Sequence, residues 1–80
     1  MKGQGQDLTQ DIFRFVDDEV KSAAIDSTGV AWFFSVPKAS LFTLNTIWGC
    51  KAGCKRWWIG EDFNSSHWKE SAIDRIPETA

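Results

Sequence analysis

The sequence predicts a small α+β domain, in which an antiparallel sheet of three or four strands carries one C-terminal helix packed on one face. Three segments support this prediction. A turn at 26–29 lies between two apolar runs, a short aromatic strand covers 56–59, and an apolar stripe runs through 68–76. The 80 residues are enough for one domain. We expect a flexible Gly/Gln-rich arm at 1–7 and a single domain at 8–80.

The first apolar segment, 12–16, is ambiguous. Leu8, Ile12, Phe15 and Val16 fit one face of a helix. The aromatic and β-branched residues of 12–16, followed by an acidic run, fit a strand instead. We favour the strand.

The clearest local signal is the turn Asp-Ser-Thr-Gly at 26–29. Aspartate is typical of the first position of a type I turn, and glycine of a position that needs positive φ. This pattern predicts a β-hairpin with a three-residue loop, which places Ala24 opposite Trp32 and Ala23 opposite Phe33. Each alanine leaves room for the aromatic ring across from it.

Both faces of this hairpin are apolar in the predicted register. One face carries Val30, Trp32, Phe34 and Val36, and the other carries Ile25, Ala31 and Phe33. Apolar residues on both faces of a sheet indicate that both faces are covered. The cover could be a loop, a second subunit or a ligand.

The remaining predicted elements are bounded by prolines and glycines, which end helices and strands. Pro37 ends the hairpin, 38–49 fits either a short helix or an irregular layer, and glycines mark 49–54 as a loop. Gly60 closes the strand at 56–59. The predicted C-terminal helix starts at a cap among Asn64, Ser65 and Ser66, and ends at Pro77. Its buried stripe is Trp68, Ala72, Ile73 and Ile76.

Aromatic residues are unusually abundant, with five tryptophans, six phenylalanines and no tyrosine. Adjacent side chains of a strand point to opposite faces, so one helix cannot bury both Trp57 and Trp58. The hairpin accounts for Trp32 and Phe34, and the apolar stripe of the predicted helix accounts for Trp68. The aromatic residues left without a predicted partner are Phe33 and one member of the Trp57–Trp58 pair.

Charge and cysteine content limit the classes of partner and site. The net charge of −2 argues against a general nucleic-acid binder, although Lys51, Lys55 and Arg56 form a local basic patch. We expect Cys50 and Cys54 to be free thiols in a reducing cytosol. The alternative, a zinc site that adds His67 and a carboxylate, lacks the usual paired ligand spacing. We therefore expect no metal and no cofactor.

The ends of the chain and its apolar runs bear on location. The N-terminus lacks the apolar stretch of a signal peptide, and no apolar run approaches the ~20 residues of a membrane span. We expect a cytoplasmic protein without membrane contact.

Catalytic patterns are not evident in the sequence. His67 follows Ser65 and Ser66, but neighbours in sequence do not form a nucleophile–base pair. Nothing in the sequence places the acidic pair at 61–62 in a closed pocket, and no phosphate-binding glycine loop is found. We predict that the protein is not an enzyme.

The predicted binding residues are Trp57, Trp58, Arg56, Lys55 and Phe33. Tryptophan and arginine are enriched at the energetic centres of protein interfaces, so a partner protein is the favoured ligand. Stacked tryptophans beside cations also suit a nucleotide or a single-stranded nucleic acid. A third possibility is a homodimer in which a second copy covers the apolar face.

Several short motifs resemble small uncharacterised bacteriophage accessory proteins. They are Ala24-Ile25-Asp26 with Gly29 and Trp32-Phe33-Phe34, then Pro37, Trp57-Trp58-Ile59-Gly60 and Trp68-Lys69-Glu70-Ser71. The resemblance covers about residues 12–77 and implies an antiparallel sheet with a terminal helix. It carries no known activity, so no functional residue is transferred. Many such proteins inhibit host defence, anti-CRISPR proteins among them. The predicted function is thus a phage-derived inhibitor that occludes a host protein, with a CRISPR–Cas or related defence complex as the leading target.

Overall fold

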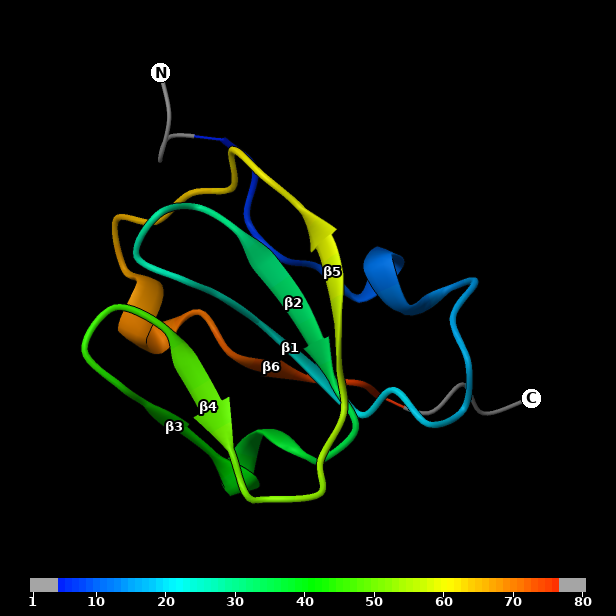
Figure 1. Cartoon of the computed structure of the whole chain (residues 1–80). Coiled ribbons are helices and arrows are strands. Elements are labelled where there is room, and N and C mark those ends of the chain that lie inside the picture. Colours follow the sequence, from blue (N-terminus) through cyan, green and yellow to red (C-terminus); the bar gives the residue numbers. More distant parts are fainter. Residues whose placement is uncertain (1–4, 77–80) are drawn as a thin grey trace.

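A computed structural model describes residues 5–76, which form two antiparallel sheets (Figure 1). The larger sheet has four strands in the order β5-β2-β1-β6, and the smaller sheet pairs β3 with β4. The strands are β1 (Ser22–Ile25), β2 (Ala31–Phe34), β3 (Leu41–Thr43), β4 (Trp48–Cys50), β5 (Arg56–Gly60) and β6 (Ile73–Asp74). Three short 3₁₀ turns are η1 (Gln10–Phe13), η2 (Lys38–Ser40) and η3 (Trp68–Glu70).

The predicted α+β class is wrong, because residues 5–76 contain no α-helix and no C-terminal helix packs on the sheet. The expected helix is replaced by η3 and by strand β6. An isolated helix as short as the 68–76 segment is marginal, because its first turn fixes several residues for a single hydrogen bond. The same segment instead satisfies the main chain of β1, whose four residues are all buried.

Strand β6 and Ser71 together complete the outer side of β1. Ser22 pairs with Asp74 and Ala23 with Ile73. Beyond the end of β6, the Ile25 N–H donates to Ser71 Oγ at 2.8 Å. The hydroxyl therefore continues the hydrogen bonding of β1 where the short strand stops.

The predicted central hairpin is confirmed. Ala23 pairs with Phe33 and Ala24 with Trp32, and the Asp26 N–H donates to the Val30 carbonyl at 2.8 Å. At the turn, Gly29 has a φ of +86°, and a Cβ there would lie 3.0 Å from the Phe63 carbonyl oxygen. Glycine is needed for both reasons, which explains why this local signal was informative.

Both faces of the hairpin are covered by the chain itself. On one face, Phe34 and Ala24 pack with Trp48 of the β3–β4 hairpin and with the partly buried Trp68. On the other face, Phe33 and Ala23 pack with buried residues of the N-terminal segment, Phe13 and Val20, along with partly buried Leu8, Ile12 and Val16. The cover that the sequence required is thus two separate segments on opposite sides of one sheet.

The strand favoured for 12–16 is wrong, because η1 ends at Phe13 and turns follow it. Phe13 is buried and Val16 packs beside it, whereas the Phe15 side chain is 94% exposed. The segment thus acts as an irregular cover that contacts the sheet through selected side chains. The 38–49 segment, for which helix or irregular structure was expected, forms the β3–β4 hairpin.

The expectation of free thiols is also wrong, because a disulfide joins Cys50 and Cys54. Cys50 ends β4, and the turn after it brings the two Cα atoms to 6.3 Å, within the range that a disulfide can bridge. Gly53 has a φ of +94°, which suits glycine in so tight a turn.

Candidate protein-binding edge

Strand β5 carries four of the five predicted binding residues on or beside it, but it divides them between two faces. Trp57 lies opposite Phe33, and Trp58 lies opposite Trp32. Phe33 is only 9% exposed and its ring centroid is 5.8 Å from that of Phe13. Trp57 packs against the same cluster. Phe33 is therefore a core residue and is not part of the candidate binding surface.

Trp58 is the exposed member of the tryptophan pair, with 58% of its surface accessible. It shares its face of the sheet with Arg56, since the two lie two residues apart on β5. The Arg56 guanidinium lies over the Trp32 ring, 5.1 Å from the centroid. Arg56 Nη1 also donates to the Trp48 carbonyl at 3.3 Å. Trp58 thus stands beside an arginine that is already fixed in position.

The buried carboxylate of Asp26 accepts hydrogen bonds from the two tryptophans that position Arg56. Asp26 Oδ2 accepts from Trp32 Nε1 at 3.0 Å, and Asp26 Oδ1 accepts from the Trp48 N–H at 3.0 Å. Burial raises the pKa of Asp26, although the two donated hydrogen bonds and the Arg56 charge act in the opposite direction. Asp26 therefore anchors the Trp32 ring on which the Arg56 guanidinium stacks.

Lys55 lies just before β5 and is held at two points. Its N–H donates to Ser35 Oγ at 2.8 Å, and its Nζ lies 3.2 Å from Glu19 Oε2. Both members of this ion pair are more than half exposed, so it adds little stability. Lys55 therefore contributes an accessible positive charge next to Arg56.

The main chain of β5 has an outward-facing side. Ser35 N–H donates to the Lys55 carbonyl at 2.9 Å, which orients Lys55 toward β2. In an antiparallel strand, the main-chain N–H and C=O groups of successive residues point to alternate sides. Those of Trp57 therefore point toward β2, as those of Lys55 do, whereas those of Arg56 and Trp58 point outward. β5 is an edge strand that pairs with β2, and within residues 5–76 no main-chain hydrogen bond outside that ladder involves Arg56 or Trp58. We call this side of β5 the open edge.

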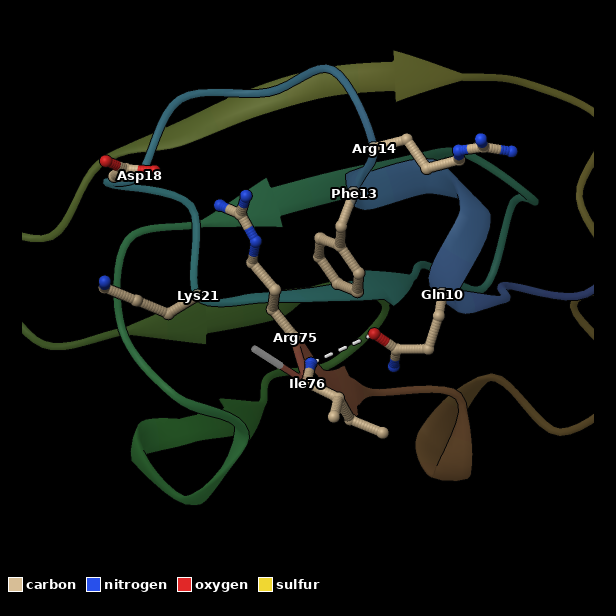
Figure 2. A pocket seen from close by; sticks show the side chains of 7 residues that line it. All are labelled: Gln10, Phe13, Arg14, Asp18, Lys21, Arg75 and Ile76. Atoms are coloured by element: carbon tan, nitrogen blue, oxygen red, sulfur yellow. Dashed lines mark hydrogen bonds between the residues drawn. The ribbon is translucent and has the colours of Figure 1, made fainter. Parts of the chain in front are cut away.

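The opposite edge of the sheet, at β6, is capped. The Arg75 N–H donates to the Lys21 carbonyl, so Asp74 and Ile76 face outward. One side chain takes two of the outward groups: Gln10 Nε2 donates to the Asp74 carbonyl at 2.7 Å, and Gln10 Oε1 accepts from the Ile76 N–H at 3.0 Å. Figure 2 shows the second of these bonds. We call this side the capped edge.

The capped edge borders a hollow of about 650 Å³. Figure 2 shows its lining residues, Gln10, Phe13, Arg14, Asp18, Lys21, Arg75 and Ile76. Arg75 Nη1 donates to the carbonyls of Asp17 and Val20, and in the view Arg14 and Lys21 point away from each other. The cations do not converge on a common point, so this hollow supports no defined ligand.

Sequence reasoning missed two exposed apolar areas. Phe42, Leu44 and Ile47 lie on the β3–β4 hairpin and are 45%, 49% and 36% exposed. Beside β5, a hollow of about 290 Å³ is lined by residues that include Phe15, Val16 and Trp57. The alternation of Phe42 and Leu44 was the available signal for the first. No local pattern marks the second, because it joins segments about forty residues apart.

Across residues 5–76, no three His, Cys, Asp or Glu side chains lie close enough together to hold a metal ion. His67 is exposed and precedes η3 without capping it through its side chain.

Comparisons with protein-family models, curated proteins and solved structures gave no match for this chain. None of the helical turns within the described range, 5–76, has the length and apolar character that crossing a membrane requires.

Proposed function

We propose that this protein acts without catalysis, by binding another protein through the open edge of β5. The observation that carries the proposal is the exposure of Trp58 on an edge strand whose neighbouring Arg56 is already fixed. Tryptophan and arginine are the residues most often found at interface hot spots. An edge strand with free main-chain donors and acceptors can also pair with a strand of the partner.

The preorganised Arg56 strengthens this proposal. Its contacts with Trp32 and the Trp48 carbonyl restrict the side chain before any partner arrives. Less conformational entropy is then lost on binding. Lys55 adds a second positive charge at the same end of β5, which favours a partner surface that is acidic next to an apolar pocket.

The biological setting follows from the resemblance to phage accessory proteins. On that basis the protein is a phage-derived inhibitor that works in the host bacterial cytoplasm by occluding a host protein. A CRISPR–Cas or related defence complex is the first target to test. Occlusion needs only a stable complex that covers the partner's working surface, so it is compatible with a small domain lacking a catalytic site.

A matched pair of variants tests the proposal. Wild-type protein and Trp58→Ala are compared for binding to purified defence complexes by surface plasmon resonance, with Phe42→Ala as a control on the other exposed apolar area. We expect Trp58→Ala to weaken binding by about 30-fold or more, as loss of a hot-spot side chain does. Equal affinity for wild type and Trp58→Ala would contradict the proposed surface.

A nucleotide or single-stranded nucleic acid is the second candidate, because an exposed indole stands beside Arg56 and Lys55. Base stacking on such a ring contributes about 1–3 kcal/mol. The test is tryptophan fluorescence titrated with nucleotides and short oligonucleotides. Quenching that Trp58→Ala abolishes would favour this candidate, and no quenching at millimolar nucleotide would remove it.

A further inference from the structure

The open edge of β5 has a charge pattern that is complementary to itself. Lys55 and Arg56 lie at its beginning, and Glu61 and Asp62 follow its end, all with exposed side chains. Two copies of β5 that run antiparallel would place the basic end of each beside the acidic end of the other. Two copies that run parallel would place like charges together, which is unfavourable.

The main-chain groups fit the same arrangement. Arg56 and Trp58 present outward N–H and C=O groups, and an antiparallel neighbour satisfies both residues when Arg56 of each copy pairs with Trp58 of the other, because the register shift after Trp58 turns Gly60 toward β2. At the capped edge, Gln10 already occupies the Asp74 carbonyl and the Ile76 N–H. Of the two edges of the sheet, that of β5 is therefore the more open to a further strand.

We propose that the occupant of the open edge is a second copy of this chain, paired antiparallel about a twofold axis near Trp57, so that Arg56 of each copy lies opposite Trp58 of the other. The two four-stranded sheets then form one continuous sheet. Because paired residues project to the same face, each Trp58 ring lies beside the Arg56 of the other copy. The proposal goes beyond partner binding, and because a second copy and the partner would use the same strand they compete for it, so the two are tested separately.

The self-complementary charges favour a second copy over an unrelated peptide strand. Each ion pair between a basic and an acidic end occurs twice in a twofold interface. The paired strand is only five residues long, so the interface is small. Interfaces below about 1,200 Å² are typical of weak complexes, and we expect dimers at concentrations near 100 µM rather than near 1 µM.

Charge reversal tests the pairing by sedimentation velocity over a concentration series. Lys55→Glu and Glu61→Lys should each raise the dimer Kd by about tenfold or more, because each reversal acts twice. The double variant, Lys55→Glu with Glu61→Lys, should recover dimerisation. Thermal melting verifies that the variants fold. A wild-type chain that stays monomeric near 1 mM, or a dimer insensitive to both reversals, would overturn the proposal.

Hydrogen exchange measured by NMR supplies an independent readout. The Arg56 and Trp58 amides should exchange quickly in dilute samples and become protected as concentration rises. The Trp57 amide faces β2 and should be protected at every concentration. Protection that is independent of concentration at both outward amides would also overturn the proposal.

Partner binding is measured separately with Glu61→Lys, which lies outside the proposed Trp58–Arg56–Lys55 surface. If this monomeric variant binds the partner, dimerisation is not required for that function. If wild type dimerises but does not bind any defence complex tested, the dimer proposal stands and the inhibitor proposal fails.

Discussion

The two edges of the four-stranded sheet differ in how their outward main-chain groups are satisfied. At β6, the amide of Gln10 bonds the Asp74 carbonyl and the Ile76 N–H. At β5, no main-chain hydrogen bond outside the ladder with β2 involves Arg56 or Trp58 within residues 5–76. Unprotected edges invite pairing with other strands, so natural proteins usually cover or charge them. The two edges therefore differ in how readily each could accept a further strand.

We expect the largest loss of stability from removing the Asp26 carboxylate, which bonds Trp32 next to the open edge and Trp48 in the core. Asp26→Ala leaves Trp32 Nε1 and the Trp48 N–H without their acceptor. Each unsatisfied buried donor costs about 1–3 kcal/mol, so we expect a loss of about 2–5 kcal/mol in the free energy of unfolding. Urea denaturation measures it, with exposed Asp18→Ala as the control. A loss as small as that of the control would contradict the anchoring role.

The adjacent tryptophans should separate stability from binding. Trp57 packs on the core cluster, so Trp57→Ala should cost about 2–4 kcal/mol, somewhat less than a fully buried tryptophan. Trp58→Ala should cost less than about 1 kcal/mol but weaken partner binding. Chemical denaturation and a binding assay on the same two variants test this. If both substitutions simply unfold the protein, the proposal that Trp58 is a surface residue for partner binding is wrong.

Opening the capped edge should have a moderate effect. Gln10→Ala removes two hydrogen bonds at an exposed position and should cost about 1–2 kcal/mol. The Ile76 amide should then exchange faster with solvent. NMR hydrogen exchange measures this, and Asp11→Ala in the same 3₁₀ turn is the control. Unchanged exchange at Ile76 would show that Gln10 does not protect this edge.

The smallest effect concerns pH. Because burial raises the pKa of Asp26 above 3.8, its stabilising contribution is fully present below that pH and is lost as pH rises through the folded-state pKa. The stability of wild type relative to Asp26→Asn should therefore fall across this range. Urea titrations of both proteins between about pH 3 and pH 7 measure it. The opposite slope would mean that the hydrogen bonds outweigh burial.

The central hairpin was predictable because its determinants are local. Gly29 needs a positive φ, and Ala23 and Ala24 face large rings, so the turn and register follow from neighbouring residues. The β5 strand was also predictable from local signals, namely a short aromatic run that Gly60 closes. The C-terminal segment was not, because its apolar spacing also fits a helix. Only the unsatisfied main chain of β1 selects the strand.

The candidate site divides in the same way. The sequence by itself determined that Trp57 and Trp58 point to opposite faces, since this follows from strand geometry. Only the tertiary structure decided that Trp58 is the exposed one, because the N-terminal segment covers the face that carries Trp57 and Phe33. It also decided that Gln10 caps one edge across a separation of more than sixty residues. Local conformation depends on neighbouring residues, whereas burial depends on which distant segment arrives to cover each face.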